Sequence, residues 1–159
     1  MIFPERFRTP YPSMAIRIVI FTLALLIGGC VQSGPATTKT KSSAFATVAE
    51  RAKFLHEYVT FRRTYETLDF DISYQNNSGG LTPAPSDWDI RLIATVPASE
   101  LQDWVPAGVS ASTAPDTGWL KSTPTTLDLS GVSEWYVDGK RMVGIDRARR
   151  IVVYRLSST

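Results

Sequence analysis

Hydrophobic residues recur at two different spacings along the chain, and the change of spacing predicts where helix gives way to strand. From Ala44 to about Tyr65 they lie three or four residues apart, the period of an amphipathic α-helix. They form two adjacent stripes: Phe45, Val48, Ala52, Leu55, Val59, and then Phe54, Tyr58, Phe61, Tyr65. Such a broad apolar face is typical of a helix that lies on a sheet. Thr47 and Glu50 have capping-box spacing, with Ser43 as an alternative cap for an earlier start.

A period of two follows and predicts strands. Apolar and polar residues alternate over 68–75 and again over 88–96, with a loop of about ten residues between them. Pro97 ends the second strand, and Ser99 can cap a short helix over 99–104.

The C-terminal part of the chain predicts a hairpin and one further strand. Residues 134–137 and 140–143 flank Asp138-Gly139, a strong signal for a two-residue turn. We expect Trp135 to face Met142 and Tyr136 to face Arg141. Residues 147–150 form a second turn before a strand over 151–156. The sequence therefore predicts an α+β domain: one long N-terminal amphipathic helix packed on an antiparallel sheet of about five strands, with a short extra helix near 99–104.

A long polar segment interrupts these strands. Residues 105–131 are rich in Ser, Thr, Pro, Gly and Ala, and Trp119-Leu120 stand isolated in the middle. Long loops of this kind are either functional or poorly ordered. Because aromatic side chains dominate tight interfaces, Trp119 is a candidate partner-binding residue.

The first thirty residues follow a third pattern. Arg17 precedes an apolar run over 18–27 that ends in Gly28-Gly29-Cys30. Its ten residues span roughly 15 Å as a helix, against ~30 Å for a bilayer core, so the run fits the apolar region of an export signal. Residues 1–13 carry three prolines and Glu5, an unusual start for a signal. We expect Met14 to be the true initiator, or residues 1–13 to be a dispensable extension.

The segment Ile27-Gly28-Gly29-Cys30 resembles the lipobox of bacterial lipoproteins, and this resemblance covers about residues 14–30. It implies cleavage between Gly29 and Cys30, removal of 1–29 as a signal peptide, and attachment of diacylglycerol and an amide-linked acyl chain to Cys30. Two or more chains anchor a protein stably in a membrane. Val31 resembles the residue that follows the cysteine in outer-membrane cargo facing the periplasm. Residues 30–43 then form a lipid-anchored flexible tether, and 44–159 one small globular domain.

Removing the signal changes the charge of the protein. Three of the 17 basic and one of the 15 acidic side chains lie in residues 1–29, which leaves fourteen of each in the mature chain. A nearly neutral domain lacks the concentrated positive charge that nucleic-acid binding needs. Acylation of Cys30 uses the single cysteine, so neither disulfides nor cysteine metal sites are expected.

The sequence shows no catalytic constellation. His56 is the single histidine and lies on the polar side of the predicted helix, and no Gly-x-Ser-x-Gly motif is present. We interpret His56 as a surface residue, and expect no metal and no cofactor.

Two groups of charged residues remain as candidate sites. Asp69 and Asp71 share one strand face, and Asp87, Asp89 and Arg91 share a face of the next strand. A calcium site or a carboxylate pair for glycan cleavage is possible there, but a solvated sheet face is the favoured interpretation. The second group is basic: Lys140, Arg141, Arg147, Arg149, Arg150, Arg155. Arg147, Arg149 and Arg150 are candidates for binding an anionic partner, although charges at turns and edges commonly serve only to prevent strand association.

These observations predict a non-enzymatic envelope lipoprotein. Its membrane attachment is through acylated Cys30, and its periplasmic domain binds another envelope component, most simply a protein. An inhibitor or immunity lipoprotein that neutralises a periplasmic toxin or hydrolase is the alternative, and an enzyme is the least favoured of the three.

Overall fold

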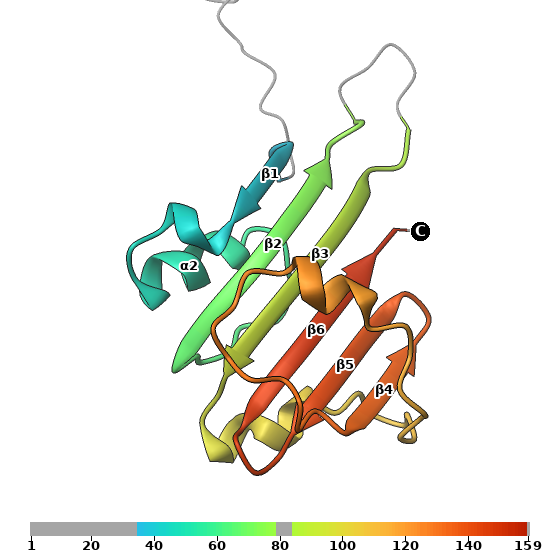
Figure 1. Ribbon diagram of the computed structural model, residues 1–159. Helices are drawn as coiled ribbons and strands as arrows, with labels where there is room; N and C mark the ends of the chain where they lie inside the picture. The colour runs from blue at the N-terminus through green and yellow to red at the C-terminus, as the bar shows by residue number, and fades with distance from the viewer. Residues whose placement is uncertain (1–34, 79–83, 159) are drawn as a thin grey trace, which may run out of the picture. The chain divides into compact units, whose positions relative to one another are not determined.

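Six antiparallel strands form one sheet, in the order β1-β2-β3-β6-β5-β4 (Figure 1). The computed structural model describes residues 35–78 and 84–158. The strands are β1 (Thr38–Lys41), β2 (Thr67–Gln75), β3 (Asp87–Thr95), β4 (Glu134–Asp138), β5 (Arg141–Asp146) and β6 (Ile151–Ser157). The described helices are α2 (Val48–Leu55) and three short 3-10 helices, η2 (Ser42–Ala44), η3 (Ala98–Trp104) and η4 (Gly118–Ser122).

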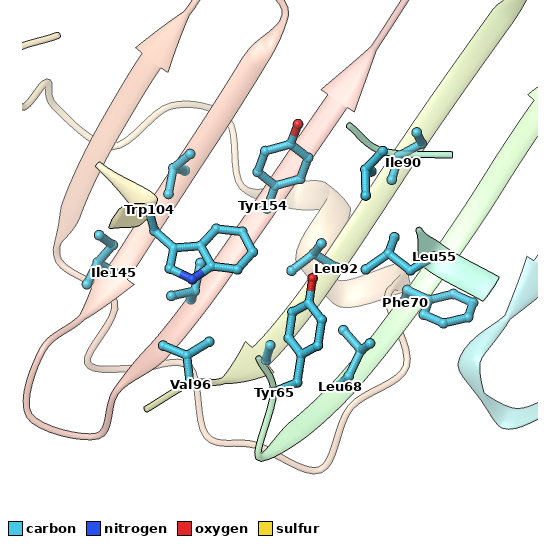
Figure 2. Close-up of a cluster of buried hydrophobic side chains, with 14 of the residues drawn as sticks. Leu55, Tyr65, Leu68, Phe70, Ile90, Leu92, Val96, Trp104, Ile145 and Tyr154 are labelled. Atoms are coloured by element: carbon cyan, nitrogen blue, oxygen red, sulfur yellow. The ribbon is translucent and has the colours of Figure 1, made fainter. Parts of the chain in front are cut away.

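The main core lies on one side of this sheet, which we call the first face. Alternate residues of β2 and β3 point to it, and Leu68, Phe70 and Leu92 are fully buried there. α2, the segment 56–65 and η3 cover it, so that Leu55 and Trp104 pack onto the strands (Figure 2). Phe54 stacks on Phe70, with ring centroids 5.9 Å apart.

The predicted long helix is wrong. α2 has eight residues, and the fold is mostly a sheet with short helices. Its start is as expected: the Thr47 hydroxyl accepts from the Glu50 amide at 3.2 Å, and the Glu50 carboxylate accepts from the Thr47 amide at 3.0 Å. The helix ends at Leu55, and the predicted pattern over 56–65 belongs to a segment without regular structure.

A hydrogen-bonded turn over 56–58 follows the helix, and the residues after it favour the break. Val59 and Thr60 are β-branched and Phe61 is aromatic, and both kinds of residue lose side-chain freedom in a helix. Phe61 meets Trp104 and Tyr154 edge to face, with both ring centroids 5.3 Å away. Once the helix has ended, Val59, Phe61 and Tyr65 all pack in the main core.

The folded unit begins earlier than expected, within the predicted tether. Thr38–Lys41 form β1 and pair with β2 along Thr38↔Tyr74 to Lys41↔Asp71. The carbonyl of Pro35 accepts from Asn76, and that of Ala36 accepts from the Tyr58 hydroxyl. The tether predicted over 30–43 is therefore folded from residue 35 onward, and the sheet has a sixth strand. Residues 1–34, with the predicted signal, Cys30 and Val31, lie outside the described residues.

The strands predicted over 68–75, 88–96 and 151–156 match β2, β3 and β6 closely, whereas the hairpin register is displaced. Trp135 pairs with Gly144 and Tyr136 with Val143, so the turn residues are Gly139 and Lys140. Gly139 has φ +58°, which suits glycine at the first turn position. A displacement by two residues changes each partner but keeps every side chain on its expected face. The helix expected over 99–104 is the 3-10 helix η3.

Across the described ranges, no helix is long and apolar enough to cross a bilayer.

Candidate functional site

The second face of the sheet is divided into a covered half and an open half. The covered half holds a smaller core of Ile93, Trp119, Trp135, Ile151 and Val153. The segment around η4 lies over it and crosses in front of the sheet in Figure 1. The open half carries polar side chains on β1, β2, β3 and β6. We call this half the open face; its residues are Lys41, Asp71, Ser73, Asp89, Arg91, Arg155 and Ser157.

Trp119 does not belong to an exposed binding loop. Its side chain is 6% exposed and packs in the core of the covered half. The hydroxyls of Ser122 and Thr123 donate to its carbonyl oxygen, which closes the turn of η4. The expected position of Trp119 in an exposed loop is therefore corrected: its side chain attaches the long segment to the sheet.

An arginine–aspartate–arginine triad occupies the middle of the open face. Arg155 donates to both Asp89 oxygens at 2.9 and 3.2 Å, and Arg91 donates to Asp89 Oδ2 through Nε at 3.0 Å and through Nη2. Arg91 also donates to the Ser122 hydroxyl at 2.8 Å. About a quarter of each of the three side chains is exposed.

The electrostatics of Asp89 follow from this geometry. Partial burial by itself raises the pKa of Asp89, because it disfavours the charged carboxylate. The hydrogen bonds and charges of Arg91 and Arg155 outweigh burial, so the pKa of Asp89 is lowered overall. The carboxylate is consequently fixed in its charged form and is unsuited to act as a general acid.

The predicted acidic cluster is thus an ion-pair surface. β2 and β3 pair as expected, with Asp71 opposite Arg91. Lys41 lies 3.9 Å from Asp71, and Arg51 lies 3.0 Å from Asp69. Within the described part of the chain, no group of three or more potential ligand residues could hold a metal ion.

Two hollows border the open face. The larger, which we call the edge groove, has a volume of about 580 Å³ and lies where β1 ends and the edge of β2 continues. Arg51 donates there to the Leu68 carbonyl and to Asp69, and the buried Ser42 donates to the same carboxylate. The remaining wall comes from residues 124–126. The smaller hollow, about 320 Å³, lies beside Ser73, Asp87 and Asp89 at the other end.

The arginines of the β5–β6 turn are engaged in ion pairs. Arg147 forms a two-point contact with Glu134 at 2.6 and 2.9 Å. Arg149 contacts Asp146 and Asp128, and Arg150 contacts Glu66. Each of the candidates Arg147, Arg149 and Arg150 therefore contacts a carboxylate, and these ion pairs stabilise the turn.

His56 ends α2 and is partly buried instead of lying on an open polar surface. Its ring centroid is 6.2 Å from that of Tyr65, and Nε2 is buried without a hydrogen-bond partner among the described atoms. Burial and the nearby Arg62 lower the pKa of His56. The ring packs beside Tyr65 at the end of α2.

The signal for the triad was present in the sequence only in part. Asp89 and Arg91 are two residues apart on one strand, which places them on the same face. Arg155 is on a distant strand, and only the β3–β6 register brings it opposite Arg91.

No family model matches the chain, and no match was found among curated proteins or among solved structures.

Proposed function

We propose that the protein is a lipid-anchored component of the bacterial envelope whose folded domain binds another envelope component. The observation that carries the proposal is the apolar run over 18–27, which follows Arg17 and ends in Gly28-Gly29-Cys30. This arrangement suits a cleaved export signal and an acylated cysteine better than a buried helix.

The beginning of the folded unit supports a close attachment. The carbonyls of Pro35 and Ala36 already accept hydrogen bonds from the folded domain. The folded domain therefore begins only a few residues after Cys30. A chain from Cys30 to Pro35 spans at most about 18 Å when extended. An acyl anchor at Cys30 therefore keeps the domain near the lipid surface.

The open face is the part of the described domain best suited to recognition. It is polar, its side chains are preorganised by ion pairs, and two hollows adjoin it. Preorganised groups lose little conformational entropy when a partner binds. A binding role without catalysis agrees with the contacts of Asp89, because both of its carboxylate oxygens accept hydrogen bonds from arginines.

The alternative of an inhibitor or immunity lipoprotein loses one of its supports. It rested on the small size of the domain, on tethering and on a long loop bearing Trp119, and Trp119 is buried.

Acylation is tested by radioactive palmitate labelling of cells that express the chain. The wild type should be labelled and sediment with membranes, whereas Cys30→Ala should lose the label and the lipid-dependent membrane association. Val31→Asp is the matched variant for sorting: it should keep the label and move the protein from outer-membrane to inner-membrane fractions. Equal labelling of wild type and Cys30→Ala would falsify the proposal.

A further inference from the structure

Two arginines face each other directly across two strands of the open face. Arg91 on β3 and Arg155 on β6 are register partners. Like charges in this position destabilise a sheet. Asp89 reduces the repulsion by accepting from both guanidinium groups, but one carboxylate balances only one of the two positive charges.

Some N–H groups of the two guanidinium groups have no hydrogen-bond acceptor among the described residues. Each guanidinium has five N–H donors in a fixed planar arrangement. Arg155 donates only to Asp89, through Nε and Nη2, and Arg91 donates to Asp89 and Ser122. The side chains are 23% and 24% exposed, and none of their nitrogens is buried without a partner, so the unused donors are open to solvent and to a ligand.

The other charges on this side of the sheet are balanced. Lys39 and Lys41 lie there with the two arginines, and Asp69, Asp71 and Asp87 lie there with Asp89. Lys41 is 3.9 Å from Asp71, and Arg51 is 3.0 Å from Asp69. Asp71 lies on the side of Arg91 away from Arg155. Among the described residues, Asp89 is therefore the carboxylate that is hydrogen-bonded to both arginines of the pair.

We propose that the Arg91–Asp89–Arg155 triad binds a phosphate group carried by an envelope molecule. Arginine forks match phosphate oxygens in pairs, and a tetrahedral phosphate can accept from two forks at once. Asp89 positions the forks. The inference deepens the proposed function, because it names the chemistry recognised at the open face, and it rests on that function for the source of the phosphate.

The test is a calorimetric titration of the full chain, in a non-ionic detergent at low salt, with inorganic phosphate. The wild type should bind phosphate saturably, and Arg155→Gln should bind at least about tenfold more weakly. Arg155→Lys keeps the positive charge but loses the planar guanidinium group, so its phosphate affinity should lie between those of the wild type and Arg155→Gln. Arg147→Gln is the matched control, because it removes another arginine that contacts a carboxylate, and its affinity should stay within about twofold of the wild type.

The folding of each variant is checked by thermal unfolding. If Arg155→Gln does not fold, Arg91→Lys provides the same comparison with the charge retained. Lack of saturable phosphate binding by the wild type, or an equal loss in Arg147→Gln, would overturn the proposal.

A second titration distinguishes the two sources of phosphate. The chain is titrated with the same detergent micelles containing either phosphatidic acid or diacylglycerol. Tighter binding to phosphatidic acid than to inorganic phosphate supports a lipid headgroup, and equal binding supports a soluble phosphate ester. Failure of Cys30 labelling would overturn the envelope location without affecting these titrations, so the two proposals can fail separately.

Discussion

The two faces of the sheet use the same strands for opposite purposes. On β2, Phe70 is fully buried on the first face, while its neighbour Asp71 contacts Lys41 on the second. On β3, Leu92 and Arg91 show the same contrast. One face therefore excludes water along its length, and the other does so only beneath η4. Stability is concentrated where the core is continuous, and the open face is available for recognition.

Truncating neighbouring residues of β2 tests this difference between the two faces most directly. Phe70→Ala should reduce the free energy of unfolding by about 3 to 5 kcal/mol, because it removes a fully buried ring and leaves a cavity. Asp71→Ala, on the opposite face, should cost less than about 1 kcal/mol. Urea unfolding followed by circular dichroism measures both. Similar losses would show that the two faces are not energetically distinct.

The covered half of the second face provides the next comparison. Trp119→Ala should cost about 3 kcal/mol, since the buried indole fills the core beneath η4. Lys121→Ala in the same 3-10 helix is exposed and should be nearly neutral. Thermal and urea unfolding of both variants gives the result. A loss below about 1 kcal/mol for Trp119→Ala would return this side chain to the candidates for partner binding.

A smaller effect is expected from the triad. Asp89→Asn should cost about 1 to 3 kcal/mol at neutral pH, because it leaves Arg91 and Arg155 facing each other without the carboxylate. The pKa of Asp89 is lower in the folded than in the unfolded protein. The stabilisation that the Asp89 carboxylate provides is therefore complete above the pKa of an aspartate in the unfolded chain, near 4. It is lost as the pH falls through the lower pKa of the folded state.

Unfolding of wild type and Asp89→Asn, measured from pH 7 to pH 3, checks this sign. The two stability curves should converge at the acidic end. A constant difference across the range would mean that the carboxylate charge does not account for the effect.

The smallest effect concerns His56 at the end of α2. Because burial and Arg62 lower its pKa in the folded state, the neutral ring is favoured there, and stability should fall as the pH drops below about 6.5. His56→Gln should remove this part of the pH dependence. Unfolding curves at pH 7.5 and 5.5 measure it; an unchanged slope in the variant would contradict the assignment.

β2 and β3 were predictable because each has one strongly apolar face. β2 and β3 repeat their apolar residues with period two, and their pairing follows from that pattern. The helix was overestimated because the four-residue spacing of Phe61 and Tyr65 also occurs in a segment without regular structure whose large side chains pack on the same core. Spacing alone does not distinguish these cases, whereas the β-branched pair Val59-Thr60 was a signal for the break.

The candidate site was only partly predictable for a different reason. The face shared by Asp89 and Arg91 follows from local spacing, but the pairing of β3 with β6 is a long-range choice. β1 was missed because Thr-Lys-Thr-Lys has no large apolar side chain, although its alternating threonines suit a strand. Lysines on an edge strand also discourage further pairing, which makes such strands resemble loops in sequence.

The position of β1 has a mechanical consequence for an anchored protein. In the proposed lipoprotein, a pull between an acylated Cys30 and the domain would act first on Pro35 and Ala36 and then on β1, a four-residue strand at the edge of the described sheet. Residues 35–46 precede the capped start of α2, and their release lengthens the connection by about 40 Å. The core strands β2, β3 and β6 would stay paired. Release of the edge strand would then lengthen the connection, so that the domain could follow a moving partner before any force reached its core strands.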